Sequence, residues 1–238
     1  EVHQLNSSHS LVGTAPVQAA AGERFCVSCA DSVGRKGYIG CNGGVVLTLV
    51  PIRHGMQSVA EFEVHARPCD TDILSLKCTS ADSYAVASRR RITIVGSDGA
   101  QRAFVELNIT AACFGPASVC CWSEGTLQMW AVTDRAIELE LSHALQHVSA
   151  LCCGANGVVF VGTDQGQLTA VPAASDVDGS MPRKLWVDVG IDAVVRLSTS
   201  GTHHVVALSA RGTLSVVDVQ TMEVVQQLTG GPAAVLVP

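Results

Sequence analysis

The chain repeats one pattern of short apolar runs and tight turns five times, and this repetition constrains its fold more than any other feature. Each unit has an apolar run, a small or polar break, a second run, a tight turn and a third run, and usually a fourth run follows. In one clear example, GVVFVGTDQGQLTAV, the turn at Gly166 separates the second run from the third. Short runs bounded by turn residues predict β-strands.

The turn between the second and third runs gives the spacing of the units. Successive turns fall at Gly44, near Arg90, and at Gly125, Gly166 and Gly212, in steps of about 46, 35, 41 and 46 residues. Glycine at four of the five turns has a physical reason, because two-residue hairpin turns need positive φ. Short strands at this spacing fit a sandwich, a barrel or a propeller, and regular repetition of one unit favours the propeller.

We therefore predict an all-β chain that forms a single β-propeller domain over residues 1–238, with four-stranded antiparallel blades. The five predicted blades cover residues 23–66, 72–108, 109–142, 147–190 and 193–230. The end segments 1–22 and 232–238 are predicted to supply extra strands of a closing or further blade. Because closure removes exposed sheet edges, two arrangements fit: part of a larger propeller completed by other sequence, or a closed ring of five blades.

One unit resembles the WD40 repeat family. The segment HALQHVSALCCGANGVVFVGTDQGQLTAV is similar to the family pattern, with His143 in the place of the loop histidine and Asp164 in that of the turn aspartate. The fifth unit has Val217-Asp218 where the family has Trp-Asp, and the third has Trp130-Ala131. WD40 blades repeat about every 40–45 residues. No unit has the full Trp-Asp signature, so quinoprotein-like or other propeller families are alternatives.

Residues 136–152 are the ambiguous stretch of the repeat. Leu141, Leu145, Val148 and Leu151 have helical spacing, and a helix here would break the repeat. The alternation Glu-Leu-Glu-Leu and the phase of the neighbouring units favour a strand, a loop and a second strand instead.

Composition narrows the class of protein. Hydrophobic residues make up 47% of the 238 residues and charged residues 15%, so the chain can bury a large core. The formal net charge of −6 argues against nonspecific binding to nucleic acid or to an anionic membrane surface. No apolar run approaches the length of about 18 residues that a membrane-spanning helix needs, so we expect no direct membrane insertion.

The ten cysteines bear on the compartment. Most of them lie in apolar runs such as SVCCW and SALCCG, where a thiol acts as a small hydrophobic group. Adjacent cysteines in a strand point to opposite faces and cannot bridge each other. We therefore expect free thiols in a reducing compartment, either cytoplasmic or nuclear, and the alternative is a set of disulfides.

Motifs for catalysis and for cofactor binding were sought and not found. Cys26-x-x-Cys29 has the spacing of half a zinc site, but it lies within a predicted strand and is interpreted as core packing. The stretch 176–179 hints at a calcium loop without the required glycine and glutamate at later positions. The pair His203-His204 is interpreted as a loop feature. We expect no enzyme activity, no cofactor, no metal site and no small-molecule substrate.

Candidate partner-binding residues cluster at the turns. Arg89, Arg90 and Arg91 take the place of a turn glycine, and three adjacent cations could bind an acidic peptide, a phosphate or a carboxylate. Trp122 lies at the end of its strand beside a turn, and Arg211 lies in the equivalent turn of the fifth unit. Tryptophan and arginine are enriched at binding hot spots. The simpler interpretations are a solvated turn for the arginines and packing between blades for Trp122.

We therefore expect a noncatalytic protein–protein interaction scaffold, a WD40-like subunit of a multiprotein complex that binds other proteins and not nucleic acid. A flat face or an open blade edge could bind the partner. One alternative is a recognition module that reads a phosphorylated or acidic peptide through the basic turn. A second is an enzyme with a site at the propeller axis. The loop at 172–184 is predicted to be a surface excursion.

Overall fold

The computed structural model describes an all-β chain. The described residues are 2–5, 11–15, 25–30, 37–54, 57–80, 82–154, 157–171, 185–189, 192–200 and 203–229. Among them, helix is limited to one short 3-10 turn at Asn42–Gly44, and none of their helices has the length and apolar character that crossing a membrane requires.

Twenty of the described strands form five antiparallel sheets of four strands each, numbered here sheets 1 to 5 in chain order. Sheet 1 contains β3 (Phe25–Ala30), β4 (Gly37–Cys41), β5 (Val46–His54) and β6 (Gln57–Ala66). Sheet 2 contains β7 (Ile73–Ser80), β8 (Ser83–Ser88), β9 (Arg91–Gly96) and β10 (Gln101–Glu106). Sheet 3 contains β11 (Ile109–Phe114), β12 (Ser118–Ser123), β13 (Thr126–Val132) and β14 (Ile137–Ala144).

Sheet 4 contains β15 (Val148–Cys153), β16 (Val159–Thr163), β17 (Gln167–Val171) and β18 (Leu185–Asp188). Sheet 5 contains β19 (Val194–Ser200), β20 (His204–Ser209), β21 (Thr213–Asp218) and β22 (Val224–Thr229). A separate hairpin of β1 (Val2–Leu5) and β2 (Leu11–Ala15) precedes them. Residues 172–184 and 232–238, for which a surface loop and an extra strand are predicted, lie outside the described residues.

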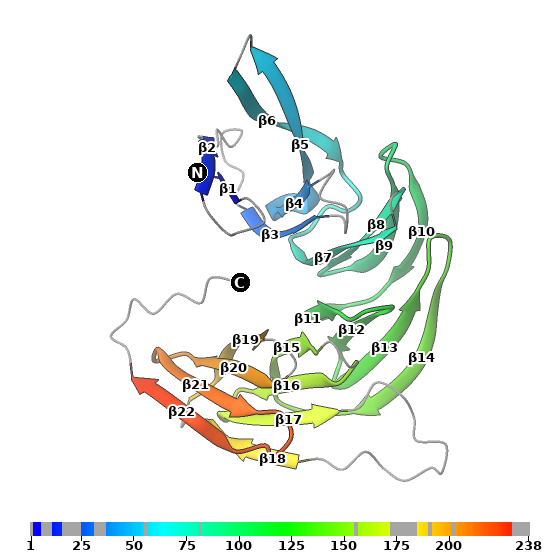
Figure 1. Ribbon diagram of the computed structural model, residues 1–238. Helices are drawn as coiled ribbons and strands as arrows, with labels where there is room; N and C mark the ends of the chain where they lie inside the picture. The colour runs from blue at the N-terminus through cyan, green and yellow to red at the C-terminus, as the bar shows by residue number, and fades with distance from the viewer. Residues whose placement is uncertain are drawn as a thin grey trace.

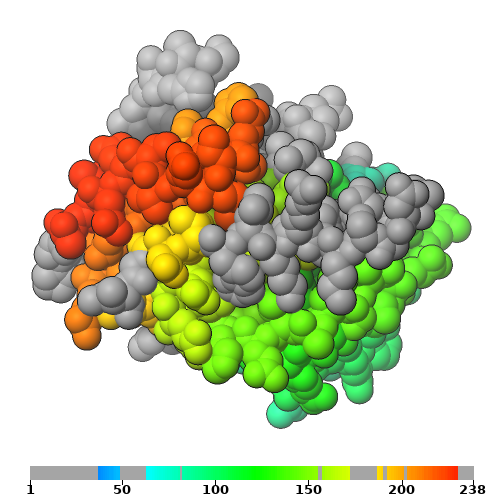
Figure 2. Space-filling model, turned by 90° about the horizontal axis from the view of Figure 1, so that it is seen from below, coloured from blue at the N-terminus to red at the C-terminus, as the bar shows by residue number. Residues whose placement is uncertain are grey.

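The five sheets follow one another around an arc (Figure 1). Within each sheet the strands pair in chain order, so the first strand is at one edge and the fourth at the other. First strands of successive sheets are neighbours: β7 contacts β3 and β11, and β15 contacts β11 and β19. In the space-filling view, the residues of sheets 3, 4 and 5 succeed one another across the surface, with sheet 5 in orange to red at one end (Figure 2).

The prediction of five four-stranded antiparallel units is confirmed. The stretch 136–152 contains β14, a short loop and β15, so the strand interpretation is correct and the helix is excluded. The turn glycines have the expected left-handed backbone, with φ of 77°, 82°, 78° and 82° at Gly44, Gly125, Gly166 and Gly212. Local turn chemistry therefore sets the ends of the second and third strands, as the sequence pattern predicts.

Alternation along the strands gives each sheet two apolar sides, called here the forward face, toward the next sheet, and the backward face, toward the preceding one. Sheet 4 illustrates the arrangement. Phe160 and Leu168 on its forward face share a core with Val205 and Val217 on the backward face of sheet 5. On its backward face, Val159 and Val161 share a core with sheet 3. Side chains one residue apart therefore serve different interfaces.

The forward face has the same construction in sheets 2 to 5. Its centre is two cross-strand pairs, each joining a residue of the second strand to one of the third. These pairs are Ala85–Ile94 and Ala87–Ile92 in sheet 2, Cys120–Met129 and Trp122–Leu127 in sheet 3, Phe160–Ala170 and Gly162–Leu168 in sheet 4, and Val206–Val216 and Leu208–Leu214 in sheet 5. The repeat is therefore a repeat of packing positions as well as of strands.

Candidate functional site

The turns between second and third strands lie at the same edge of the molecule as the segments that connect successive sheets, and we call this the connector edge. Backbone hydrogen bonds join turn and connector in each of sheets 2 to 5. In sheet 2, the Arg89 N–H donates to the Asp72 carbonyl and the Leu107 N–H donates to the Arg90 carbonyl. In sheet 4, the Asp164 N–H donates to the His147 carbonyl. The backbone of each turn is thereby fixed against its connector, and the turn side chains project from one edge.

A hydroxyl side chain at the end of the second strand stabilises these turns. Thr163 Oγ1 accepts the N–H groups of Gln165 and Gln167, and Ser209 Oγ accepts the Thr213 N–H. In sheet 2, Ser88 plays the same part. Sequence reasoning missed this feature, although its signal is present: a serine or threonine directly precedes each of these turns.

The basic turn of sheet 2 lacks glycine, and Ser88 helps to explain why it needs none. Ser88 Oγ accepts the N–H groups of Arg90 and Arg91 and donates to the Arg91 carbonyl at 3.1 Å. Neither Arg89 nor Arg90 has positive φ. An ordinary turn with negative φ, closed by a side-chain hydroxyl, accommodates bulky residues where a primed turn would not.

Two of the three arginines of this turn lie near carboxylates of the preceding connector. Arg89 Nε is 3.9 Å from Asp72 Oδ2, and Arg90 Nη1 is 3.6 Å from Asp70 Oδ2. All four side chains are at least half exposed. Exposed pairs of this kind contribute about 0–1 kcal/mol to stability because solvent and salt screen them. Breaking these ion pairs therefore costs little free energy, so a partner could replace them with ion pairs of its own.

Arg91 has a different environment. It begins β9 and is half-buried, and its guanidinium carbon lies 5.7 Å from the centre of the Phe104 ring. This geometry gives a cation–π contact. In the β9–β10 register, Arg91 is directly opposite Glu106. Arg91 is therefore anchored in its sheet, whereas Arg89 and Arg90 extend into solvent.

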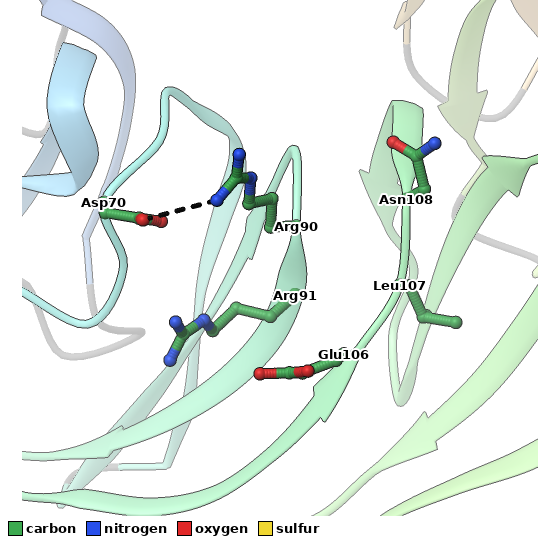
Figure 3. Close-up of a pocket in the computed structure, with 6 residues that line it drawn as sticks. All are labelled: Asp70, Arg90, Arg91, Glu106, Leu107 and Asn108. Carbon is green, nitrogen blue, oxygen red and sulfur yellow. Dashed lines mark ion pairs between the residues drawn. The ribbon is translucent and has the colours of Figure 1, made fainter.

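A cavity of about 470 Å³ opens beside this turn. Its lining includes the cations Arg90 and Arg91, the anions Asp70 and Glu106, and also Leu107 and Asn108. Figure 3 shows the two guanidinium groups on the side of Asp70, while Leu107 points away from them. Sequence reasoning found the two arginines and missed the carboxylates and the amide, because the connectors that carry these residues give no motif.

The structure places the other two predicted contact residues elsewhere. Trp122 is half-buried and packs on the core between sheets 3 and 4, and its indole N–H donates to the Leu145 carbonyl at 2.8 Å. This is the position of a packing residue. Arg211 lies in the turn of sheet 5, where its Nε is 3.1 Å from Asp192 Oδ1, so it does not join the arginines of sheet 2. Its guanidinium side chain is largely exposed.

The residue-level prediction for the loop histidine is wrong. His143 lies within β14, opposite Leu127, and not in a loop. The loop residue is His147, whose Nδ1 is 3.3 Å from the Asp164 carboxylate. Both His143 and His147 precede β15 in HALQHV, and only the end of β14 decides between them. A polar side-chain pair between a turn and its connector thus recurs in sheets 2, 4 and 5.

The predicted metal and thiol features can be followed in part. Cys26 and Cys29 lie in β3, as predicted. The side chains of these two cysteines and the stretch 176–179 are not among the parts of the chain that the structure describes. His204 begins β20. Within the described part of the chain, no group of three His, Cys, Asp or Glu side chains has an arrangement that could hold a metal ion.

The eight cysteines whose side chains are described are free thiols. Burial raises the pKa of Cys121 and that of Cys152 to about 12, so both are protonated at neutral pH. Their environment is that of core side chains and not of reactive thiolates.

No protein-family model matches the chain, and no curated protein matches it.

Proposed function

We propose that the chain is a noncatalytic protein–protein interaction scaffold, built as a WD40-like β-propeller and acting as a subunit of a multiprotein complex. The propeller reading is supported by the order of the sheets around an arc and by the first strands that neighbour one another along its inner side (Figure 1). Such an arrangement leaves its turn-bearing edge free for partners, and connecting loops on rigid scaffolds are common binding positions.

The observation that carries the proposal is the connector-edge cavity with its two guanidinium groups and two carboxylates. Polar groups held on rigid turns, with ion pairs that cost little to open, suit a partner surface that brings charges of both signs. The partner in this proposal is a folded protein or a peptide with mixed charge.

The alternative, a reader of phosphorylated or acidic peptides, is less well supported. A phosphate group needs a concentration of positive charge and charge-assisted hydrogen bonds. Here Arg90 lies near Asp70, and Arg91 is opposite Glu106 and over the Phe104 ring. An added anion would meet two carboxylates as well as two cations, which weakens the electrostatic gain.

Charge reversal at Arg90 tests the proposal. Arg90→Glu removes a cation from the cavity rim without touching a core, so folding, followed by circular dichroism and Tm, should stay unchanged. Affinity purification of the tagged chain from its own cells, with quantitative mass spectrometry, should recover its main partners at least about fivefold less well. This corresponds to about 1 kcal/mol of binding free energy.

Arg135→Glu is the matched control, because Arg135 is also exposed and lies in the β13–β14 turn, at the edge opposite the connectors. The control should leave partner recovery unchanged. If Arg90→Glu also leaves it unchanged, the cavity is not the binding surface. Phosphatase treatment of the lysate separates the alternative: loss of binding after treatment would favour the phosphopeptide reader.

A further inference from the structure

The connector-edge cavity holds two cations and two anions, and the chain pairs only some of them with each other. Arg90 and Asp70 form the one ion pair among the six described residues that line the cavity (Figure 3). Arg91 and Glu106 are directly opposite each other in the β9–β10 register, and no ion pair joins them. One guanidinium group and one carboxylate at this cavity therefore have no charged partner among the described residues.

The Phe104 ring explains why Arg91 and Glu106 stay apart. Phe104 precedes Glu106 by two residues in β10, so the two side chains lie on the same face of the sheet. The guanidinium carbon of Arg91 lies 5.7 Å from the centre of the Phe104 ring, a diagonal cross-strand contact that long side chains can reach. The cation–π contact therefore holds the guanidinium group over the ring and not beside the carboxylate of Glu106.

The other surroundings of Arg91 do not neutralise its charge. Its Nε is buried and makes no hydrogen bond to a described residue. The Cys69 thiol lies within electrostatic range of Arg91, but burial raises the pKa of this thiol, so it is uncharged at neutral pH. Glu106 is exposed at the end of β10. The cavity thus presents a fixed positive charge and a neighbouring negative charge that a ligand can reach.

The kind of ligand follows from these two charges. A lone anion at Arg91 would be repelled by Glu106, and a lone cation at Glu106 would be repelled by Arg91, whereas a group that carries both signs is attracted by both. Asn108 also lines the cavity, and its carboxamide offers a donor and an acceptor of the kind that a peptide backbone needs. Because Arg91 and Glu106 are cross-strand neighbours, the two charges of the ligand must be neighbours as well.

We propose that Arg91 and Glu106 recognise a segment of the partner protein in which an acidic and a basic residue lie within about four positions of each other. The aspartate or glutamate of this segment pairs with Arg91, and its lysine or arginine pairs with Glu106. Arg91 suits a carboxylate because its planar guanidinium group is already held in place on Phe104. The inference rests on the proposed function, since it takes the connector-edge cavity as the binding surface and names what is recognised there.

Site-specific photo-crosslinking in the native cells identifies the segment. The full chain carries p-benzoylphenylalanine in place of Arg89, which is exposed in the same turn and is not among the residues that line the cavity. The control variant carries it in place of Leu139, an exposed residue of β14. The expected product joins position 89 to a different protein, at a segment with an acidic and a basic residue within about four positions. Its yield should be at least about tenfold above that at position 139.

Binding measurements with the protein so identified test the two charges separately. Arg91→Gln and Glu106→Gln should each raise its Kd for the purified chain at least about tenfold. Arg135→Gln and Glu138→Gln are the matched controls, because both residues are exposed at or next to the β13–β14 turn, and they should leave Kd unchanged. Circular dichroism and Tm verify that each variant folds.

A double-mutant cycle assigns each charge to its partner. Neutralising the acidic residue of the partner's segment should cancel the effect of Arg91→Gln and leave that of Glu106→Gln in place. Neutralising the basic residue should do the reverse.

Two outcomes overturn this inference and leave the proposed function standing. One is a Kd that neither Arg91→Gln nor Glu106→Gln changes, although Arg90→Glu lowers recovery of the partner. The other is a crosslinked segment whose charged groups are all acidic or phosphorylated. Crosslinks confined to this chain, or a yield at position 89 no higher than at position 139, would overturn the inference together with the proposed function, because no partner would then lie at the cavity.

Discussion

Sheets 4 and 5 have the same arrangement of residues on their forward faces, and among the described strands only the forward face of sheet 4 lies under a further sheet. Leu168 in sheet 4 and Leu214 in sheet 5 occupy the same register position. Each is the second residue of the third strand, which follows the turn glycine. Leu168 is completely buried, whereas Leu214 is half-buried. Phe160 and Val206 differ in the same way. Equivalent aliphatic residues therefore have different roles according to whether a further sheet lies on them.

A second position separates the two faces. Gly162 in sheet 4 is equivalent to Leu208 in sheet 5. A Cβ atom at Gly162 would lie 2.6 Å from Val194 Cγ1, so sheet 5 approaches sheet 4 too closely for any side chain there. Sheet 5 has a leucine at this position. Any sheet that packed on the forward face of sheet 5 would have to accommodate Leu208, whereas sheet 5 meets no side chain at Gly162.

The largest effect is expected from Leu168→Ala. Removing a fully buried leucine from the covered face leaves a cavity, and the free energy of unfolding should fall by about 3 kcal/mol. Urea denaturation followed by circular dichroism measures this. A loss below about 1 kcal/mol would mean that sheets 4 and 5 do not pack as tightly as the geometry indicates.

Thiol labelling compares the solvent accessibility of the forward faces of sheets 4 and 5 directly. Cys152 and Ser198 are equivalent, because they are opposite Phe160 and Val206 in their sheets. Burial raises the pKa of Cys152 to about 12, so at pH 8 it is a protonated, covered thiol. A cysteine introduced by Ser198→Cys should react at least about 100-fold faster, a difference of about 2.7 kcal/mol. Peptide mapping of a maleimide-labelled sample identifies each site, and equal rates would contradict the comparison.

A smaller loss is expected from Gly162→Ala. The added methyl group would collide with Val194 and force sheet 5 away, at a cost of about 2 kcal/mol. Gly125→Ala is not a suitable control, because its φ of 82° strains any side chain. Leu208→Ala is the matched variant on the other face and should change the free energy of unfolding by less than half as much. Thermal denaturation of both variants provides the measurement.

The smallest effect is expected from Leu214→Ala. Leu214 is half-buried on the forward face of sheet 5. Its replacement by alanine should lower the free energy of unfolding of the isolated chain by less than about 1 kcal/mol, since the side chain gives up little buried area. The same denaturation experiment as for Leu168→Ala measures it. A loss equal to that of Leu168→Ala would show that Leu214 is a core residue in the isolated chain and would contradict the comparison of the two faces.

Much of the fold follows from local patterns. Alternating apolar residues and turn glycines gave the five units, and the Glu-Leu-Glu-Leu alternation correctly favoured a strand at β14. The loop histidine was misassigned to His143, because the end of β14 depends on pairing with β13 as far as Thr126. That pairing is a property of the sheet and not of the segment HALQHV.

The candidate site was predictable only in part. The triple arginine is visible in the sequence, but its partners Asp70 and Asp72 precede it by about 20 residues, and Glu106 follows by 15. No motif links these positions. Trp122 was a plausible rim residue by type, and the contact of its indole with the Leu145 carbonyl assigns it to packing instead. Residue type alone could not separate these roles.

The sequence by itself determined the number of strands in each of the five units, their antiparallel order within each unit and the place of each turn. These properties depend on the two-residue alternation of strands and on backbone torsions at glycine, and both act over a few neighbouring residues. Only the tertiary structure decided which side of each sheet is buried against a neighbour and which carboxylates lie near the arginines. It also decided that the apolar residues on the forward face of sheet 5 are half-buried, whereas those on sheet 4 are buried. Those outcomes depend on contacts between sheets that are remote in sequence, where the same aliphatic residue can be core or surface.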